Sequence, residues 1–190
     1  MTSPVTYPEI AVESRTQLRA LLADATGAGF WAVTWKKGRG PHVTYDEVVE
    51  EALCVGWVDS RGRRVDEDRT ALLLTPRRAQ SRWAGSNKAR VQRLTEAGLM
   101  RPAGLAAVEA AQASGAWTAL DDVENLVEPT DLRAALDAVP AARTHWDGFS
   151  RSARRALLDW ISTAKRDATR ARRIERTVTE AAAGRRADER

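Results

Sequence analysis

The chain has 190 residues, of which 43% are hydrophobic and 29% charged, and its formal net charge is +4. This composition predicts a globular protein and argues against a disordered chain. Cys54 is the single cysteine, which excludes an internal disulfide framework. The N-terminal residues lack the features of a secretory signal, and no apolar stretch approaches the ~20 residues of a membrane helix. We therefore expect a cytoplasmic protein that does not enter a membrane.

The first half of the chain predicts a small sheet with helices against it. After an irregular lead-in at residues 1–13, capping residues and apolar spacing predict two helices, and runs of β-branched and aromatic residues predict three strands. The predicted helices cover residues 14–24 and 45–55, and the predicted strands cover residues 30–37, 57–61 and 70–75. Gly56 suits the left-handed position after the second helix, and the charged run that follows Arg61 should form a hairpin turn.

From residue 86 onward the apolar spacing is helical throughout. The predicted helices cover residues 86–97, 102–115, 129–138, 149–164 and 168–183, and residues 184–190 form a flexible tail. The sequence therefore predicts an α+β fold with a small, mainly antiparallel three-stranded sheet covered by helices. We expect one compact domain over residues 10–183, with an α+β core at about 14–97 and a helical portion at about 102–183.

The segment around the second and third predicted strands has an unusual density of tryptophan and arginine. Its candidate ligand-binding residues are Trp57, Asp59, Arg61, Arg77, Arg78, Trp83, Asn87 and Arg90. Strand alternation places Trp57, Asp59 and Arg61 on one face. Guanidinium groups fit carboxylates and phosphates, and tryptophan rings stack on flat or apolar groups, so these residues predict an anion-binding cleft. The alternative is that the tryptophans belong to the core and Asp59 is a structural partner of an arginine.

Several of these residues also resemble a known family. The matching segments are YDEVVEEALCVGWVD at 45–59, TPRR at 75–78 with Ser81, Trp83, Asn87 and Arg90, the strand at 31–37, GLMRPAG at 98–104, and parts of 152–174 that include Ala164, Lys165, Arg172 and Ile174. They are similar to the YdeI/OmpD-associated (OmdA-like) family, with Val55 where the family usually has phenylalanine. The resemblance covers nearly the whole chain. It implies a bacterial protein linked to protection against antimicrobial agents, without an established reaction.

Two other functions are alternatives to the binding of a small acidic ligand. Residues 61–93 contain 10 Lys or Arg against 3 Asp or Glu, and residues 170–176 contain four further arginines, so the chain could bind nucleic acid. Those arginines are Arg170, Arg172, Arg173 and Arg176. The second competitor is an enzyme of unassigned reaction in the same cleft.

No residue pattern identifies a catalytic group, metal site or cofactor. Cys54 lies at a helix C-terminus, where the dipole disfavours a thiolate, so it is interpreted as a packed thiol. His42 and His145 lack neighbouring ligands at zinc-binding spacing. The acidic residues of the second helix are interpreted as a solvated face; they are Asp46, Glu47, Glu50 and Glu51. The leading hypothesis is thus a non-enzymatic binding protein.

Overall fold

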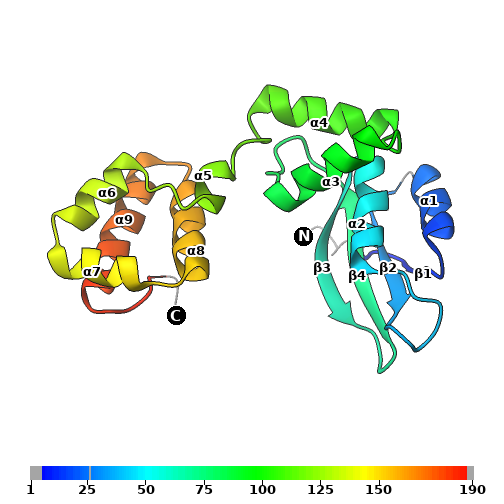
Figure 1. The fold of residues 1–190 in the computed structure, drawn as a ribbon, viewed down its shortest axis with the longest axis horizontal. Coiled ribbons are helices and arrows are strands. Elements are labelled where there is room, and N and C mark those ends of the chain that lie inside the picture. Colours follow the sequence, from blue (N-terminus) through cyan, green and yellow to red (C-terminus); the bar gives the residue numbers. More distant parts are fainter. Residues whose placement is uncertain (1–5, 26, 188–190) are drawn as a thin grey trace. The chain divides into compact units, whose positions relative to one another are not determined.

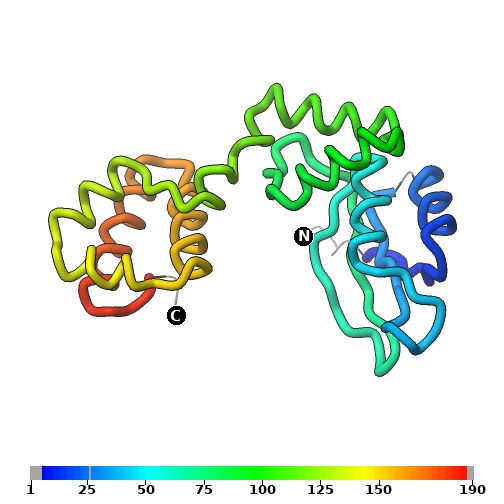
Figure 2. The backbone as a smooth tube through the Cα atoms, viewed as in Figure 1, coloured from blue at the N-terminus to red at the C-terminus, as the bar shows by residue number. Residues whose placement is uncertain are grey.

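The structure is a computed structural model that describes residues 6–25 and 27–187. Contacts within the chain divide it into two compact units, one ending at Thr118 and the other beginning at Ala119 (Figures 1 and 2). The expected single domain over residues 10–183 stays a prediction. The helix at residues 102–114, which we expected in the helical portion, belongs to the first unit.

The first unit is an α+β structure with a mixed sheet (Figure 1). Its elements are β1 (Glu9–Ala11), α1 (Arg15–Ala23), β2 (Phe30–Trp35), α2 (Tyr45–Cys54), β3 (Trp57–Arg64), β4 (Arg69–Pro76), α3 (Gly85–Glu96) and α4 (Pro102–Ser114). In the described residues the sheet has four strands in the order β1-β2-β4-β3. The strand β1 is parallel to β2, and the other pairs are antiparallel.

The expected three-stranded sheet is therefore wrong by one strand, because β1 lies within the lead-in that we expected to be irregular. A strand of three residues is too short for its alternation to be recognised. It is held by long-range bonds at both ends: Trp31 N donates to Pro8 O, and Val12 N donates to Val33 O, each at 2.8 Å. Only the pairing with β2 makes these residues a strand.

The helix α2 is buried on two sides and therefore organises the first unit. On one side, its Val48 packs with Leu18 of α1 and with Phe30 and Leu74 of the sheet. On the other side, its Leu53 belongs to a second apolar cluster, which includes side chains from α3 and α4. Because both sides are apolar, Glu51 of α2 is buried, and the prediction that it belongs to a solvated face is wrong.

A β-bulge in β3 changes which face its side chains occupy. The pairing with β4 shifts between Asp59 and Gly62, and one extra residue inverts the alternation beyond it. Trp57 remains on the face covered by α1 and α2, where it packs in the core. The Arg61 guanidinium instead lies 5.9 Å from the Trp31 ring, on the opposite face. The expectation that Trp57, Asp59 and Arg61 share one face is therefore wrong.

In the described residues of the second unit, all of the regular secondary structure is helical. Its helices are α5 (Asp121–Glu124), α6 (Thr130–Asp137), α7 (Pro140–Gly148), α8 (Arg151–Ser162) and α9 (Asp167–Ala182). They pack around a core in which Trp146, Leu157 and Ile161 are fully buried. Trp146 Nε1 donates to Glu128 Oε1 at 2.8 Å, and Arg143 donates to both Glu128 oxygens at 2.8 and 2.9 Å. Glu128 thus joins the buried tryptophan to the surface of this unit.

Candidate functional site

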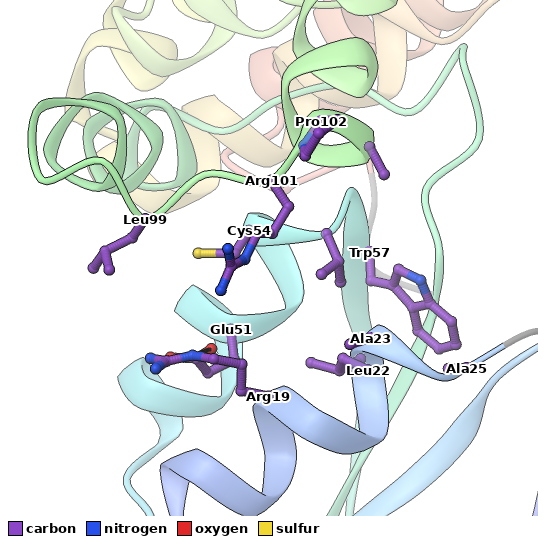
Figure 3. A pocket seen from close by; sticks show the side chains of 12 residues that line it. Arg19, Leu22, Ala23, Ala25, Glu51, Cys54, Trp57, Leu99, Arg101 and Pro102 are labelled. Carbon is purple, nitrogen blue, oxygen red and sulfur yellow. Dashed lines mark hydrogen bonds and ion pairs between the residues drawn. The ribbon is translucent and has the colours of Figure 1, made fainter.

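A pocket of about 480 Å³ lies at the C-terminal end of α2, between α1 and the loop that leads into α4 (Figure 3). Much of its wall is apolar and includes Leu22, Trp57 and Leu99. Three charged side chains also line it: Arg19, Glu51 and Arg101. A volume of this size fits a small organic molecule.

The pocket exists because the end of α2 and the start of α4 meet closely. Gly56 follows α2 with φ +77°, as predicted, and lets the chain turn into β3. Arg101 N donates to Cys54 O at 2.9 Å. A Cβ atom at Gly104 would lie 2.3 Å from the same carbonyl oxygen, so only glycine permits this approach. The loop before α4 therefore places the Arg101 side chain at the pocket.

Glu51 forms the acidic part of the pocket wall, and arginines bind both of its oxygens. It is 1% exposed. Arg19 donates from Nε to Glu51 Oε2 at 2.8 Å and from a terminal nitrogen to Oε1 at 2.7 Å, and Arg15 Nε also donates to Oε1. Burial alone would raise the pKa of Glu51, but these hydrogen bonds outweigh it and hold the pKa below its usual value. Glu51 is therefore a charged carboxylate, and each of its oxygens already accepts a hydrogen bond from an arginine.

Arg101 is the cation in the pocket that has no such partner. Its side chain points from the start of α4 toward Cys54 and Glu51 (Figure 3). Its guanidinium forms no hydrogen bond or ion pair with any residue in the described ranges. Together, Arg19, Glu51 and Arg101 give the wall one excess positive charge. The pocket thus combines an apolar surface with an uncompensated guanidinium.

Cys54 also lines the pocket, but as a thiol. Burial raises its pKa to about 11, and the nearby Glu51 carboxylate raises it in the same direction. At neutral pH the sulfur is therefore protonated and a weak nucleophile. This agrees with its interpretation as a small packed side chain.

The two tryptophans of the predicted site are buried. Trp57 is 6% exposed and Trp83 is 1% exposed. Trp57 nevertheless forms part of the pocket wall. Trp83 packs against Trp117, with ring centroids 5.0 Å apart, and its Nε1 has no hydrogen-bond partner among the described residues.

Three other predicted residues, Asp59, Asn87 and Arg90, lie near the start of α2. Two side chains of that helix bind two of them: Asp46, which we expected on a solvated face, binds Arg90, and Tyr45 binds Asp59. Tyr45 Oη donates to Asp59 Oδ2 at 2.8 Å. Arg90 donates to Asn87 Oδ1 at 3.0 Å and also pairs with Asp46. These contacts connect α2 to β3 and to α3.

The remaining predicted arginines have separate environments. Arg77 is half-buried with its Cζ 3.7 Å from the Trp83 ring centroid, and burial lowers its pKa to about 10 despite the opposing effect of Asp59. Arg78 is exposed. Arg61 lies on the far face of the sheet. The structure does not bring the eight residues into one cleft, and the ligand-binding role assigned to them stays a prediction.

The pocket residues that sequence reasoning missed are Arg19, Glu51 and Arg101. A signal existed for Glu51, because it lies three residues after Val48 and four before Val55, within the apolar stripe of its helix. An acid in such a position requires a partner. No local pattern marks Arg101, whose position depends on the contact between α2 and α4.

The arginines of α9 are partly engaged within the second unit. Arg170 donates to both oxygens of Asp131 at 2.7 and 3.0 Å, and Arg173 donates to Trp160 O and Thr163. The described residues contain no cluster of three or more His, Cys, Asp or Glu side chains suited to a metal. In the same ranges, no helix is both long and apolar enough to cross a membrane.

Two family models match the chain, and each falls within one unit. The model described as "Domain of unknown function (DUF8412)" matches residues 10–107 and includes all the residues that line the pocket. The model described as "Bacteriocin-protection, YdeI or OmpD-Associated" matches residues 125–184. No curated protein and no solved structure matches the chain. The second model confirms the YdeI/OmpD-associated resemblance over part of the chain.

Proposed function

Because this chain belongs to the family described as Domain of unknown function (DUF8412), whose description gives no reaction, we propose a function from the pocket itself. The protein is a cytoplasmic binding protein that holds a small acidic ligand at the C-terminal end of α2. The ligand is a monocarboxylate with an apolar body. Its carboxylate binds Arg101, and its body lies against Leu22, Leu99 and Trp57.

The observation that carries this proposal is the unmatched charge of Arg101. Glu51 does not neutralise it, because both Glu51 oxygens already accept hydrogen bonds from Arg15 and Arg19. A carboxylate accepts two parallel hydrogen bonds from a guanidinium, which gives both strength and orientation. One excess positive charge favours a ligand with one negative charge over a polyanion.

The description of the model matched by residues 125–184 provides a biological context. We propose that ligand binding by the first unit serves protection against an antimicrobial agent. The role of the second unit in this process is a separate question, because the pocket is built from the first unit alone.

Isothermal titration calorimetry with a panel of medium-chain and aromatic carboxylic acids tests the proposal. We expect at least one acid to bind and its uncharged amide to bind much more weakly. Arg101→Ala should weaken binding about tenfold or more, because a charge-assisted hydrogen bond contributes roughly 1.5–3 kcal/mol. Lys37→Ala is the matched control, since it removes one positive charge in the loop before the other end of α2.

The proposal fails if no acid in the panel binds, if the acid and its amide bind equally, or if both variants bind as the wild type does. A bulky substitution at the pocket wall, Ala23→Phe, gives an independent measurement. Ala23 is exposed, so the fold should tolerate the larger ring while the space available to the ligand decreases.

A further inference from the structure

A second depression, of about 810 Å³, lies at the opposite end of α2 from the pocket. It is bounded by the β3–β4 hairpin, by the loop that joins β2 to α2, and by Tyr45 in the first turn of α2. The ten residues of α2 separate it from the pocket by about 15 Å. We refer to it as the hairpin groove.

The hairpin groove has a cluster of cations without acidic partners. Lys36, Lys37 and Arg64 line it, and within the described part of the chain none of them forms an ion pair. Lys36 Nζ donates to the backbone oxygen of Glu67 at 2.6 Å, and Arg64 Nε donates to that of Asp66 at 2.9 Å. These carbonyl contacts hold the side chains in place but leave their charges uncompensated.

Two of the three acids of the adjacent hairpin turn are paired elsewhere, and the third, the exposed Glu67, does not line the groove. Asp66 accepts hydrogen bonds from the Arg69 side chain and from two backbone amides. Asp68 lies 3.4 Å from Arg39. Arg63, which also lines the groove, pairs with Glu9. Among the lining residues, Lys36, Lys37 and Arg64 therefore outnumber the one carboxylate without a cationic partner, that of Asp59.

The floor of the groove is open because residue 62 is glycine. A Cβ atom there would meet no atom closer than 4.0 Å, and the backbone is not left-handed, so glycine is not required by local geometry. In the next row of the sheet, Thr34 pairs with Thr70 and Thr70 pairs with Arg64. Two threonines thus lie in the same row of the sheet as Arg64, and both line the groove.

The other end of the groove offers a hydrogen-bond acceptor. Asp59 Oδ2 accepts from Tyr45 at 2.8 Å, and Oδ1 accepts no hydrogen bond from any described side chain or amide. Tyr45 is 56% exposed, so its ring is available to a ligand. This end therefore suits a neutral group that carries hydroxyl or amino donors and a flat face.

We propose that the hairpin groove binds a phosphorylated small molecule with hydroxyl groups, of the nucleoside diphosphate class. The phosphates lie on Lys36, Lys37 and Arg64, where lysines act as point charges and the guanidinium fork binds two oxygens. Sugar hydroxyls or ring amino groups donate to Asp59 Oδ1. This ligand differs from the monocarboxylate of the pocket, and the two sites are independent.

Titration calorimetry on the full chain at low ionic strength, with ADP, pyrophosphate and ribose 5-phosphate, tests the assignment. We expect ADP to bind more tightly than either fragment. Lys37→Ala and Arg64→Ala should each weaken ADP binding about tenfold. Gly62→Leu should remove binding without a change in melting temperature, because its side chain fills an open floor. Arg101→Ala is the matched control and should bind ADP as the wild type does.

A decathymidine oligonucleotide separates a small ligand from a nucleic-acid backbone, which presents the same phosphates. Tighter binding of the oligonucleotide than of ADP would overturn the assignment in favour of nucleic acid. Equal affinities for pyrophosphate and ADP would contradict the proposed contacts of the nucleoside with Asp59 and Tyr45. No binding of ADP at millimolar concentration, or unchanged binding by Gly62→Leu and Arg64→Ala, would remove the site.

Discussion

Glu51 in the first unit and Glu128 in the second unit are both carboxylates bound by arginine. They differ in the charged groups around the pair, which are mainly acidic at Glu128 and basic at Glu51. Around Glu128, the same Arg143 also lies near Asp147 and Asp137, so acids are in excess. Around Glu51, two arginines are used and Arg101 remains. A buried acid–arginine pair is common in structural networks. The comparison shows that the unmatched charge beside such a pair, and not the pair itself, distinguishes a candidate binding site.

The largest effect that we predict from this comparison is on stability. Glu51→Gln should lower the free energy of unfolding of the first unit by about 3 kcal/mol, because Arg15 and Arg19 lose their buried partner. This value is at the low end for a buried pair, since both arginines are partly exposed. Urea denaturation followed by hydrogen exchange in each unit measures the change, because two units need not unfold together.

Glu50→Gln is the control, since Glu50 is 18% exposed and pairs with Arg15 and Arg93. It should cost less than about 1 kcal/mol. The pKa of Glu51 is lowered in the fold, so its contribution is present above the unfolded pKa of about 4.3 and is lost as the pH falls through the folded pKa. The difference between wild type and Glu51→Gln should therefore narrow in acid. A constant difference down to pH 3 would contradict the charge argument.

A smaller loss of stability is expected when the other carboxylate, Glu128, is neutralised. Glu128→Gln should cost the second unit about 1.5 kcal/mol, because the glutamine oxygen still accepts from Trp146 and because Arg143 keeps its other acidic partners. The same denaturation experiment measures it. If Glu128→Gln destabilised its unit as much as Glu51→Gln does, the two carboxylates would be equivalent and the contrast between them would disappear.

Much of the fold follows from local sequence signals. The starts of the helices at residues 45 and 102 and the glycine at 56 all lie where predicted, because the capping box of Thr44 and Glu47, Pro102 and Gly56 each act within one helical turn. The edge strand β1 and the helix α7 were not predicted. A three-residue strand is defined by its partner, and α7 begins at Pro140, directly after the predicted end of α6.

The candidate site was less predictable because it depends on contacts between distant segments. Trp57 was correctly placed at the start of a strand, but the bulge after Asp59 moved Arg61 to the other face. Glu51 and Arg101 are 50 positions apart in the chain, and only the packing of α4 on α2 brings both to the pocket. Charge density along the sequence therefore identified a region rich in arginine without identifying which guanidinium is unmatched.

The smallest predicted effect is the most informative. Arg101→Ala should change the free energy of unfolding by less than about 0.5 kcal/mol, because the side chain has no partner among the described residues. Arg19→Ala should cost about 2 kcal/mol, because it leaves Glu51 with one arginine and a buried oxygen without a donor. Both variants remove one positive charge from the same pocket, so thermal denaturation separates a structural arginine from an unmatched one. If Arg101→Ala destabilised the first unit as much as Arg19→Ala, Arg101 would be a third structural partner of Glu51, and the pocket would have no charge to offer a ligand.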